Sequence, residues 1–246
     1  MQADLRLVAT REALLPLTPR ERLILALDVP ELDAARDLVR RLIPAVRWFK
    51  IGSELFTAAG PRAVALVLEQ GGWVFLDLKF HDIPHTIRGA VASAVRLGAS
   101  MVNVHTAGGD EMMRAAAEAR GTAPAYVIGV TALTSAEEEL TRIVEMARRA
   151  QEAGLDGVVA SPREAAPIKA ACGAPFVVVT PGIRPLPVPA DDQRRIATPA
   201  AAIEGGSDFL VVGRPVLNAP DPLEAVERIV DEIALVTPAH VRKSER

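Results

Sequence analysis

Short apolar runs rich in Val, Ile, Leu and Phe recur along this chain, and a longer Ala-rich segment with charges at helical spacing follows each one. Continuous apolar runs, as opposed to strict alternation, are typical of strands covered on both faces, as in parallel sheets. Eight such strands are predicted. They begin near Leu23, Arg47, Trp73, Met101, Ala125, Gly157, Phe176 and Phe209.

The segments between the runs are predicted helices. Glycine commonly stands just past the last turn of a helix, and glycines occupy such places in five of these segments. They are Gly71-Gly72, Gly98, Gly154, Gly173 and Gly205-Gly206.

Eight strand-helix units match a single α/β domain, a (β/α)8 or TIM barrel, whose typical length is about 250 residues. We predict an N-terminal tail over residues 1–20, the barrel as catalytic domain over 21–236 and a C-terminal tail over 237–246. A doubly wound open sheet is the alternative, but no Gly-rich dinucleotide fingerprint accompanies the strands.

Charge and aromatic content bear on the partners. The 28 basic residues nearly balance the 31 acidic ones in this chain of 246, which leaves a net charge of -3. No basic field is available for a nucleic-acid polymer, and 4% aromatic residues offer no platform for stacking bases. Any phosphate must be bound by a few placed groups.

The chain carries no predicted targeting or membrane segment. Asp4, Arg6 and Arg11 interrupt the first twenty residues, which excludes a secretory signal. The longest uncharged stretch, 121–136, is shorter than the roughly 18 residues of a membrane span. One cysteine, Cys172, can form no internal disulfide. We therefore expect a cytoplasmic protein with no membrane partner.

Polar residues gather where the predicted strands end. Barrel enzymes place their chemistry at the carboxyl ends of the strands, so these residues are candidates for a site. They are Asp28, Lys50, Asp77, Lys79, His105, Thr134, Gly182, Arg184, Gly213 and Arg214.

The third strand is the most informative. Strand alternation puts Asp77 and Lys79 on one side, facing the barrel interior near its mouth, with the apolar residues between them facing the helices. Unpaired charges there are too costly to leave alone. They must pair with each other or with Lys50. The alternative is an ion pair that only fixes strand register.

The segment DLKFHDIPHT at 77–86 resembles the signature of the orotidine 5'-monophosphate decarboxylase family. LALDV, FKIG, VNVH, LTS, TPGIRP, DDQRR and VVGRPV stand in the order that this family has, from residue 23 to about residue 216. The resemblance implies decarboxylation of orotidine 5'-monophosphate to uridine 5'-monophosphate and CO2, the final step of de novo pyrimidine biosynthesis. It also implies a homodimer that needs no cofactor and no metal.

The resemblance further implies an alternating network of Lys50, Asp77, Lys79 and Asp82. As an ammonium, Lys79 would stabilise the C6 carbanion and then protonate it. An arginine could hold the charge but could not give up the proton. Asp82 and Thr86 would reach the site of the partner subunit. The substrate-binding residues implied are Asp28, Lys50, Ile83, Thr86, Thr134, Ser135, Pro181, Arg184, Gln193, Gly213 and Arg214.

Phosphate is expected in the loops after strands seven and eight, where many barrels bind it. Gly213 and Arg214 suit that role, and a strand-end glycine beside a solvated arginine is the alternative. The proline-rich segment 185–192 is predicted to be a lid. By resemblance, Arg184 and Gln193 on either side of it would close over the phosphate.

Other interpretations stay open. A magnesium-dependent sugar-phosphate decarboxylase or aldolase-type lyase would use the same barrel, with its acidic residues as metal ligands. A catalytically silent phosphate-binding barrel is a third class.

Single residues also have alternative roles. Thr134 and Ser135 could instead cap a helix. A zinc site at His81 and His85 is disfavoured by the proline between them. His105 is expected to be a supporting hydrogen-bonding residue.

Overall fold

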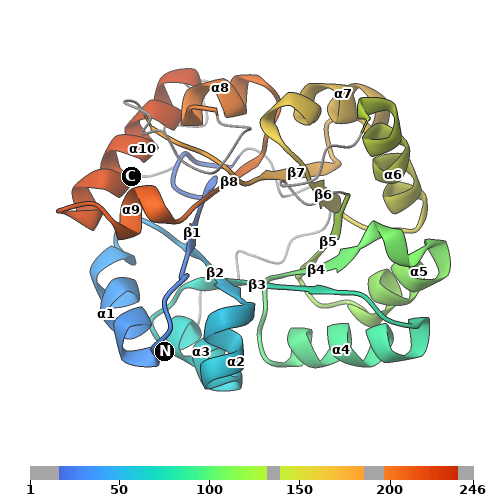
Figure 1. The fold of residues 1–246 in the computed structure, drawn as a ribbon, viewed down its shortest axis with the longest axis horizontal. Coiled ribbons are helices and arrows are strands. Elements are labelled where there is room, and N and C mark those ends of the chain that lie inside the picture. Colours follow the sequence, from blue (N-terminus) through green and yellow to red (C-terminus); the bar gives the residue numbers. More distant parts are fainter. Residues whose placement is uncertain (1–16, 132–138, 186–196, 238–246) are drawn as a thin grey trace.

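The computed structural model of this chain describes residues 17–131, 139–185 and 197–237. Within them, eight parallel strands close into a barrel, because β1 pairs with both β2 and β8 (Figure 1). The predicted (β/α)8 barrel is confirmed, and the open sheet is excluded. The strands are β1 (Leu23–Ala26), β2 (Trp48–Gly52), β3 (Trp73–Phe80), β4 (Met101–His105), β5 (Tyr126–Val130), β6 (Gly157–Val159), β7 (Val177–Thr180) and β8 (Phe209–Val212).

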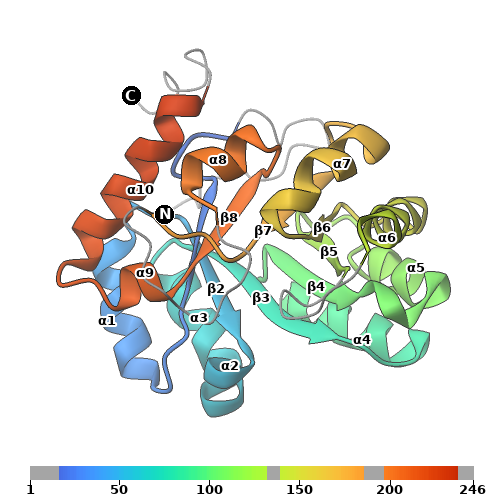
Figure 2. The ribbon, with the colours of Figure 1, turned by 45° about the horizontal axis from the view of Figure 1, so that its top comes forward.

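Helices form a ring outside the barrel (Figures 1 and 2). After β2, where one helix is expected, Gly60 and Pro61 divide the segment into two. The described helices are α1 (Leu32–Leu42), α2 (Ser53–Ala59), α3 (Pro61–Glu69), α4 (Pro84–Arg96), the 3-10 turn η2 (Thr106–Gly108), α5 (Asp110–Ala119), α6 (Leu140–Glu152), α7 (Pro162–Cys172), α8 (Pro199–Glu204), α9 (Arg214–Leu217) and α10 (Pro222–Val236).

The predicted helix ends are confirmed. Gly173 is the C-cap of α7, and Gly98 follows the C-cap of α4. Both have positive φ, at 83° and 96°, a conformation that glycine adopts without steric cost. These stops let each helix turn back toward the next strand.

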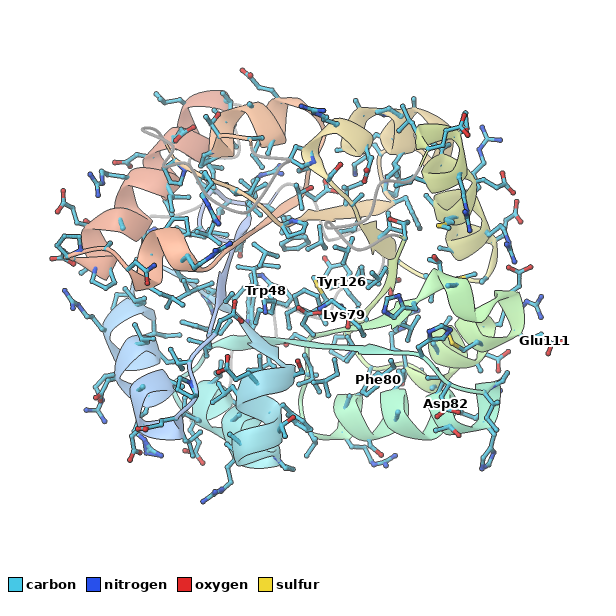
Figure 3. The ribbon with its side chains drawn as sticks, viewed as in Figure 1. Trp48, Lys79, Phe80, Asp82, Glu111 and Tyr126 are labelled. Atoms are coloured by element: carbon cyan, nitrogen blue, oxygen red, sulfur yellow. The ribbon has the colours of Figure 1, made fainter. Side chains whose placement is uncertain are left out.

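The core has two layers. A larger one lies between the strands and the surrounding helices, and a smaller one fills the barrel itself. Inside the barrel, the rings of Trp48 and Phe209 meet edge to face with centroids 5.5 Å apart, and Tyr126 packs beside them (Figure 3). Leu17 belongs to this inner cluster. Among the described residues, these side chains fill the barrel interior, as is usual for this architecture.

Two aspartates anchor the amino-terminal ends of the strands. Asp156, just before β6, accepts a hydrogen bond from the backbone N–H of Val127 in β5 at 2.8 Å. Asp208, just before β8, accepts one from the N–H of Val178 in β7 at 2.7 Å and pairs with Lys169. These carboxylates are satisfied by the fold, which makes this end of the barrel structural.

None of the helices in the described ranges is long and apolar enough to cross a membrane.

Candidate active site

Four charged side chains line up at the carboxyl ends of β1, β2 and β3. Nζ of Lys50 lies 3.0 Å from Oδ1 of Asp28 and 3.4 Å from Oδ2 of Asp77. Nζ of Lys79 lies 2.7 Å from Oδ1 of the same Asp77. Asp77 thus pairs with both lysines, as inward-facing charges require. The row alternates in sign and stands at the end where barrel enzymes carry their chemistry.

The Asp77 carboxyl is the centre of this row. Its side chain and that of Lys50 are each 11% exposed, so water screens the pair only weakly. Burial raises the pKa of Asp77, but the two lysines and hydrogen bonds from Lys79 and Asn103 outweigh burial and hold that pKa below its usual range. Asp77 is therefore ionised at neutral pH and fixes both ammonium groups.

Lys79 has an unusual backbone. Its φ is 49°, in the left-handed region that residues with a side chain rarely adopt. The pairing of β3 with β4 shifts register between Leu76 and Phe80, so the strand is irregular where strict alternation is expected. A residue held in this way costs roughly 1–3 kcal/mol and persists only where its surroundings fix it.

Asn103 in β4 was not singled out from the sequence, although it lies in the VNVH motif. Its Nδ2 donates to Oδ1 of Asp77 at 2.7 Å, and its Oδ1 accepts from the backbone N–H of Lys79 at 2.8 Å. Its side chain is almost fully buried. The signal in the sequence is a lone amide between valines in a strand covered on both faces, which must find partners inside the fold.

The end of β8 comes close to the charged row. A Cβ built on Gly213 would lie 3.4 Å from Oδ2 of Asp28, and one on Gly52 would lie 3.3 Å from Nζ of Lys50. Gly213 is also the N-cap of α9, which begins at the exposed Arg214. Gly213 and Arg214 therefore stand at the same mouth as Lys50.

The predicted residues after β7 are placed in part. Arg184 is buried, and its backbone N–H donates to the carbonyl of Ala197 at 3.0 Å. Pro181 is half-buried. Thr134, Ser135 and Gln193 lie outside the described residues, as does most of the segment predicted to be a lid.

Asp82 lies apart from the charged row in the single chain. Asp82, Ile83 and Thr86 are exposed, and Asp82 lies at the periphery while Lys79 is near the centre (Figure 3). Its Oδ1 accepts from the N–H of Ile83 at 2.6 Å. Within the described part of the chain, no cation lies at ion-pair distance from Asp82, and the second carboxylate on Lys50 is that of Asp28.

Two histidines lie side by side, His105 at the end of β4 and His81 just after β3. The rings of His81 and His105 lie 5.3 Å apart between centroids. Burial lowers the pKa of His105, and the neighbouring His81 and Lys79 lower it further. His105 is therefore held neutral. Over the described ranges, no group of three or more His, Cys, Asp or Glu side chains has the arrangement of a metal site.

The closed barrel and the lysine-carboxylate row define a (β/α)8-barrel enzyme whose polar groups converge at the carboxyl ends of the strands. The sequence profile described as "Orotidine 5'-phosphate decarboxylase / HUMPS family" matches residues 21–229. The chain belongs to this family.

Relatives match over most of their length. An orotidine 5'-phosphate decarboxylase from Moorella thermoacetica is 50% identical over 236 residues, which cover 88% of this chain and 94% of the relative. An orotidine 5'-phosphate decarboxylase from Syntrophotalea carbinolica is 49% identical over 233 residues, which cover 87% of this chain and 96% of that relative. The crystal structure of that enzyme from Lactobacillus acidophilus aligns with a TM-score of 0.76 at 33% identity, over 87% of this chain and 99% of the other. The predicted enzyme class, a carboxy-lyase of this family, is confirmed.

Proposed function

We propose that this chain converts orotidine 5'-monophosphate to uridine 5'-monophosphate and CO2, the final step of de novo pyrimidine biosynthesis. The observation that carries the proposal is the ammonium of Lys79, held 2.7 Å from Asp77 at the barrel mouth, with Lys50 on the other carboxylate oxygen. The names of the relatives at about half identity support the same substrate.

The reaction needs a fixed cation. When the bond between C6 of the pyrimidine and its carboxylate breaks, the electron pair stays on C6 and no ring carbonyl is positioned to delocalise it. The Lys79 ammonium stabilises this developing charge and then transfers a proton to C6, leaving a neutral amine that takes a proton from solvent. Asp77 holds that ammonium in place.

The other charged groups orient the substrate. Asp77 stands beside the departing carboxylate, where like charges repel. Lys50 contacts the ribose hydroxyls, and Asp28, 3.0 Å from its ammonium, hydrogen-bonds the ribose. By resemblance to the family, the phosphate and the pyrimidine are bound by residues of the later loops. They are Thr134, Ser135, Pro181, Arg184, Gln193, Gly213 and Arg214.

The proposal includes a homodimer in which Asp82 and Thr86 reach the partner's site. The exposed position of this segment supports it, because Asp82 has no cation partner within the described part of its own chain and the apolar Ile83 is 64% exposed. A second subunit would cover Ile83 and supply a partner for Asp82. Sedimentation of free and ligand-bound protein tests the dimer, and a monomer under both conditions contradicts it.

A magnesium-dependent lyase is the alternative. It would use Asp28 and Asp77 as metal ligands, but the ammonium of Lys50 lies within 3.4 Å of both carboxylates, in the space that such an ion would need. The proposed reaction uses no cofactor. We place it in the cytoplasm, where a free thiol such as that of Cys172 persists.

One assay tests the function. Purified protein is incubated with orotidine 5'-monophosphate in excess chelator, and the loss of orotate absorbance is followed. Loss of absorbance under these conditions supports the proposal. Loss only after magnesium is added supports the lyase, and no loss in either case supports a catalytically silent barrel.

A further inference from the structure

We propose that Asn103 is a positioning residue that fixes the catalytic ammonium of Lys79 through both ends of that residue. The inference rests on the proposed function of Lys79. The amide of Asn103 closes a ring of three hydrogen bonds with Asp77 and Lys79. Asn103 thus joins the backbone of Lys79 to the carboxylate that holds its side chain.

The ring replaces part of the strand ladder. Phe75 and Leu76 pair with Met101 and Val102, and pairing resumes only at Phe80 with Val104. Four steps along β3 therefore correspond to two along β4, and Asn103 lies opposite the excess residues. Its Oδ1 accepts the Lys79 N–H at 2.8 Å in place of a backbone carbonyl. This contact stabilises the left-handed conformation of Lys79.

The same amide also fixes the carboxylate. Oδ1 of Asp77 accepts from Nδ2 of Asn103 and from Nζ of Lys79, each at 2.7 Å, while Oδ2 faces Lys50. One orientation of the Asn103 amide satisfies both neighbours, because only Nδ2 can donate to a carboxylate and only Oδ1 can accept from an N–H. A buried side chain with both groups satisfied has little freedom to move.

Two variants test this role. Asn103→Ala removes both contacts, and we expect kcat to fall about a hundredfold, as for a reacting group displaced by about 1 Å, with a smaller change in affinity for uridine 5'-monophosphate. The Lys79 amide should also exchange with solvent faster, as measured by NMR. Unchanged exchange together with kcat within about threefold of the unmodified enzyme contradicts the proposal.

Asn103→Asp is isosteric and adds a pH readout. The charged groups around this position are Asp77 and Lys79 from β3 and Lys50 from β2, and the titratable His105 lies further along β4. A protonated carboxyl can donate to Asp77 and accept from Lys79, as the amide does, whereas an ionised one repels Asp77. We therefore expect the ratio of variant to unmodified kcat to fall as pH rises from about 5 to 8. A ratio that does not change with pH contradicts the proposal.

A matched control separates positioning from stability. Asp156→Ala also removes a buried acceptor of a strand N–H, that of Val127, but at the opposite end of the barrel. It should lower the unfolding midpoint while kcat per folded molecule and its pH profile stay unchanged. If Asn103→Ala does not fold, Asn103→Asp decides the matter. If the unmodified enzyme is inactive, the proposed function fails, and amide exchange at Lys79 still tests the contact.

Discussion

The ammonium of Lys50 lies 3.0 Å from the carboxylate of Asp28. This contact joins the end of β1 to the lysines of β2 and β3, and a Cβ on Gly213, just after β8, would come within 3.4 Å of the same carboxylate. Asp28 therefore connects the lysine row to the mouth near Arg214, where the phosphate is expected. Within the described part of the chain, Asp28 forms no hydrogen bond or ion pair with Lys79.

Asp28→Asn tests whether this carboxylate serves binding more than chemistry. The amide cannot balance the Lys50 charge, so orientation of the ribose should suffer while the Asp77–Lys79 pair stays intact. We expect KM for orotidine 5'-monophosphate to rise about tenfold or more, with a smaller fall in kcat. Steady-state kinetics measure both. A large fall in kcat at unchanged KM would show that Asp28 acts in the chemical step.

The phosphate end is tested by a pair of substrates and one variant. Removing the phosphate should depress kcat/KM severely, because remote binding energy then no longer favours a closed, water-poor site. Arg214→Ala should lower kcat/KM for the nucleotide by about a hundredfold or more, as loss of a charge-assisted contact does, and leave the nucleoside almost unaffected. Equal efficiency with nucleotide and nucleoside would contradict the phosphate role.

We expect His105 to make the stability of the folded protein depend on pH. Its pKa is lowered in the fold, chiefly by burial, so below about pH 6.5 the unfolded chain binds a proton that the folded one resists. Neutral His105 therefore makes its full contribution to the free energy of unfolding above that pH, and this contribution is lost as the pH falls below it. His105→Gln should therefore flatten the decline of the urea midpoint on acidification.

Exposed His85 supplies the control for that experiment. In His85→Gln, the urea midpoint should fall between about pH 7 and 5 as steeply as in the unmodified protein, with all proteins measured at one concentration. A slope that is the same in all three proteins would show that His105 does not govern acid stability.

Much of the fold and part of the site could be predicted from the sequence. Strands buried on both faces give continuous apolar runs, so the barrel and the shared side of Asp77 and Lys79 could be predicted from the sequence. The role of Asn103 could not be predicted, because it depends on the register shift opposite Lys79, and no local sequence pattern encodes that shift. Asp28 was expected at the ribose, but its contact with Lys50 depends on how two strand ends meet.

The position of Asp82 has a different physical reason. The sequence places it five residues after Asp77, but β3 ends at Phe80 and α4 begins at Pro84, so Asp82 lies in the connection between them, at the periphery, while Lys79 is near the centre (Figure 3). The proposed role of Asp82 across a subunit boundary is not encoded in the strand pattern of a single chain. Family resemblance could therefore suggest this role, while periodicity could not.

The most direct measurement of the central claim is the single-turnover rate of Lys79→Ala with orotidine 5'-monophosphate, beside its affinity for uridine 5'-monophosphate. Lys79→Arg is the matched variant, because it keeps the charge and cannot supply the proton. The account predicts no measurable turnover for Lys79→Ala while ligand binding remains measurable. Substantial residual turnover in folded Lys79→Ala would contradict the assignment of Lys79 as the group that stabilises and protonates C6.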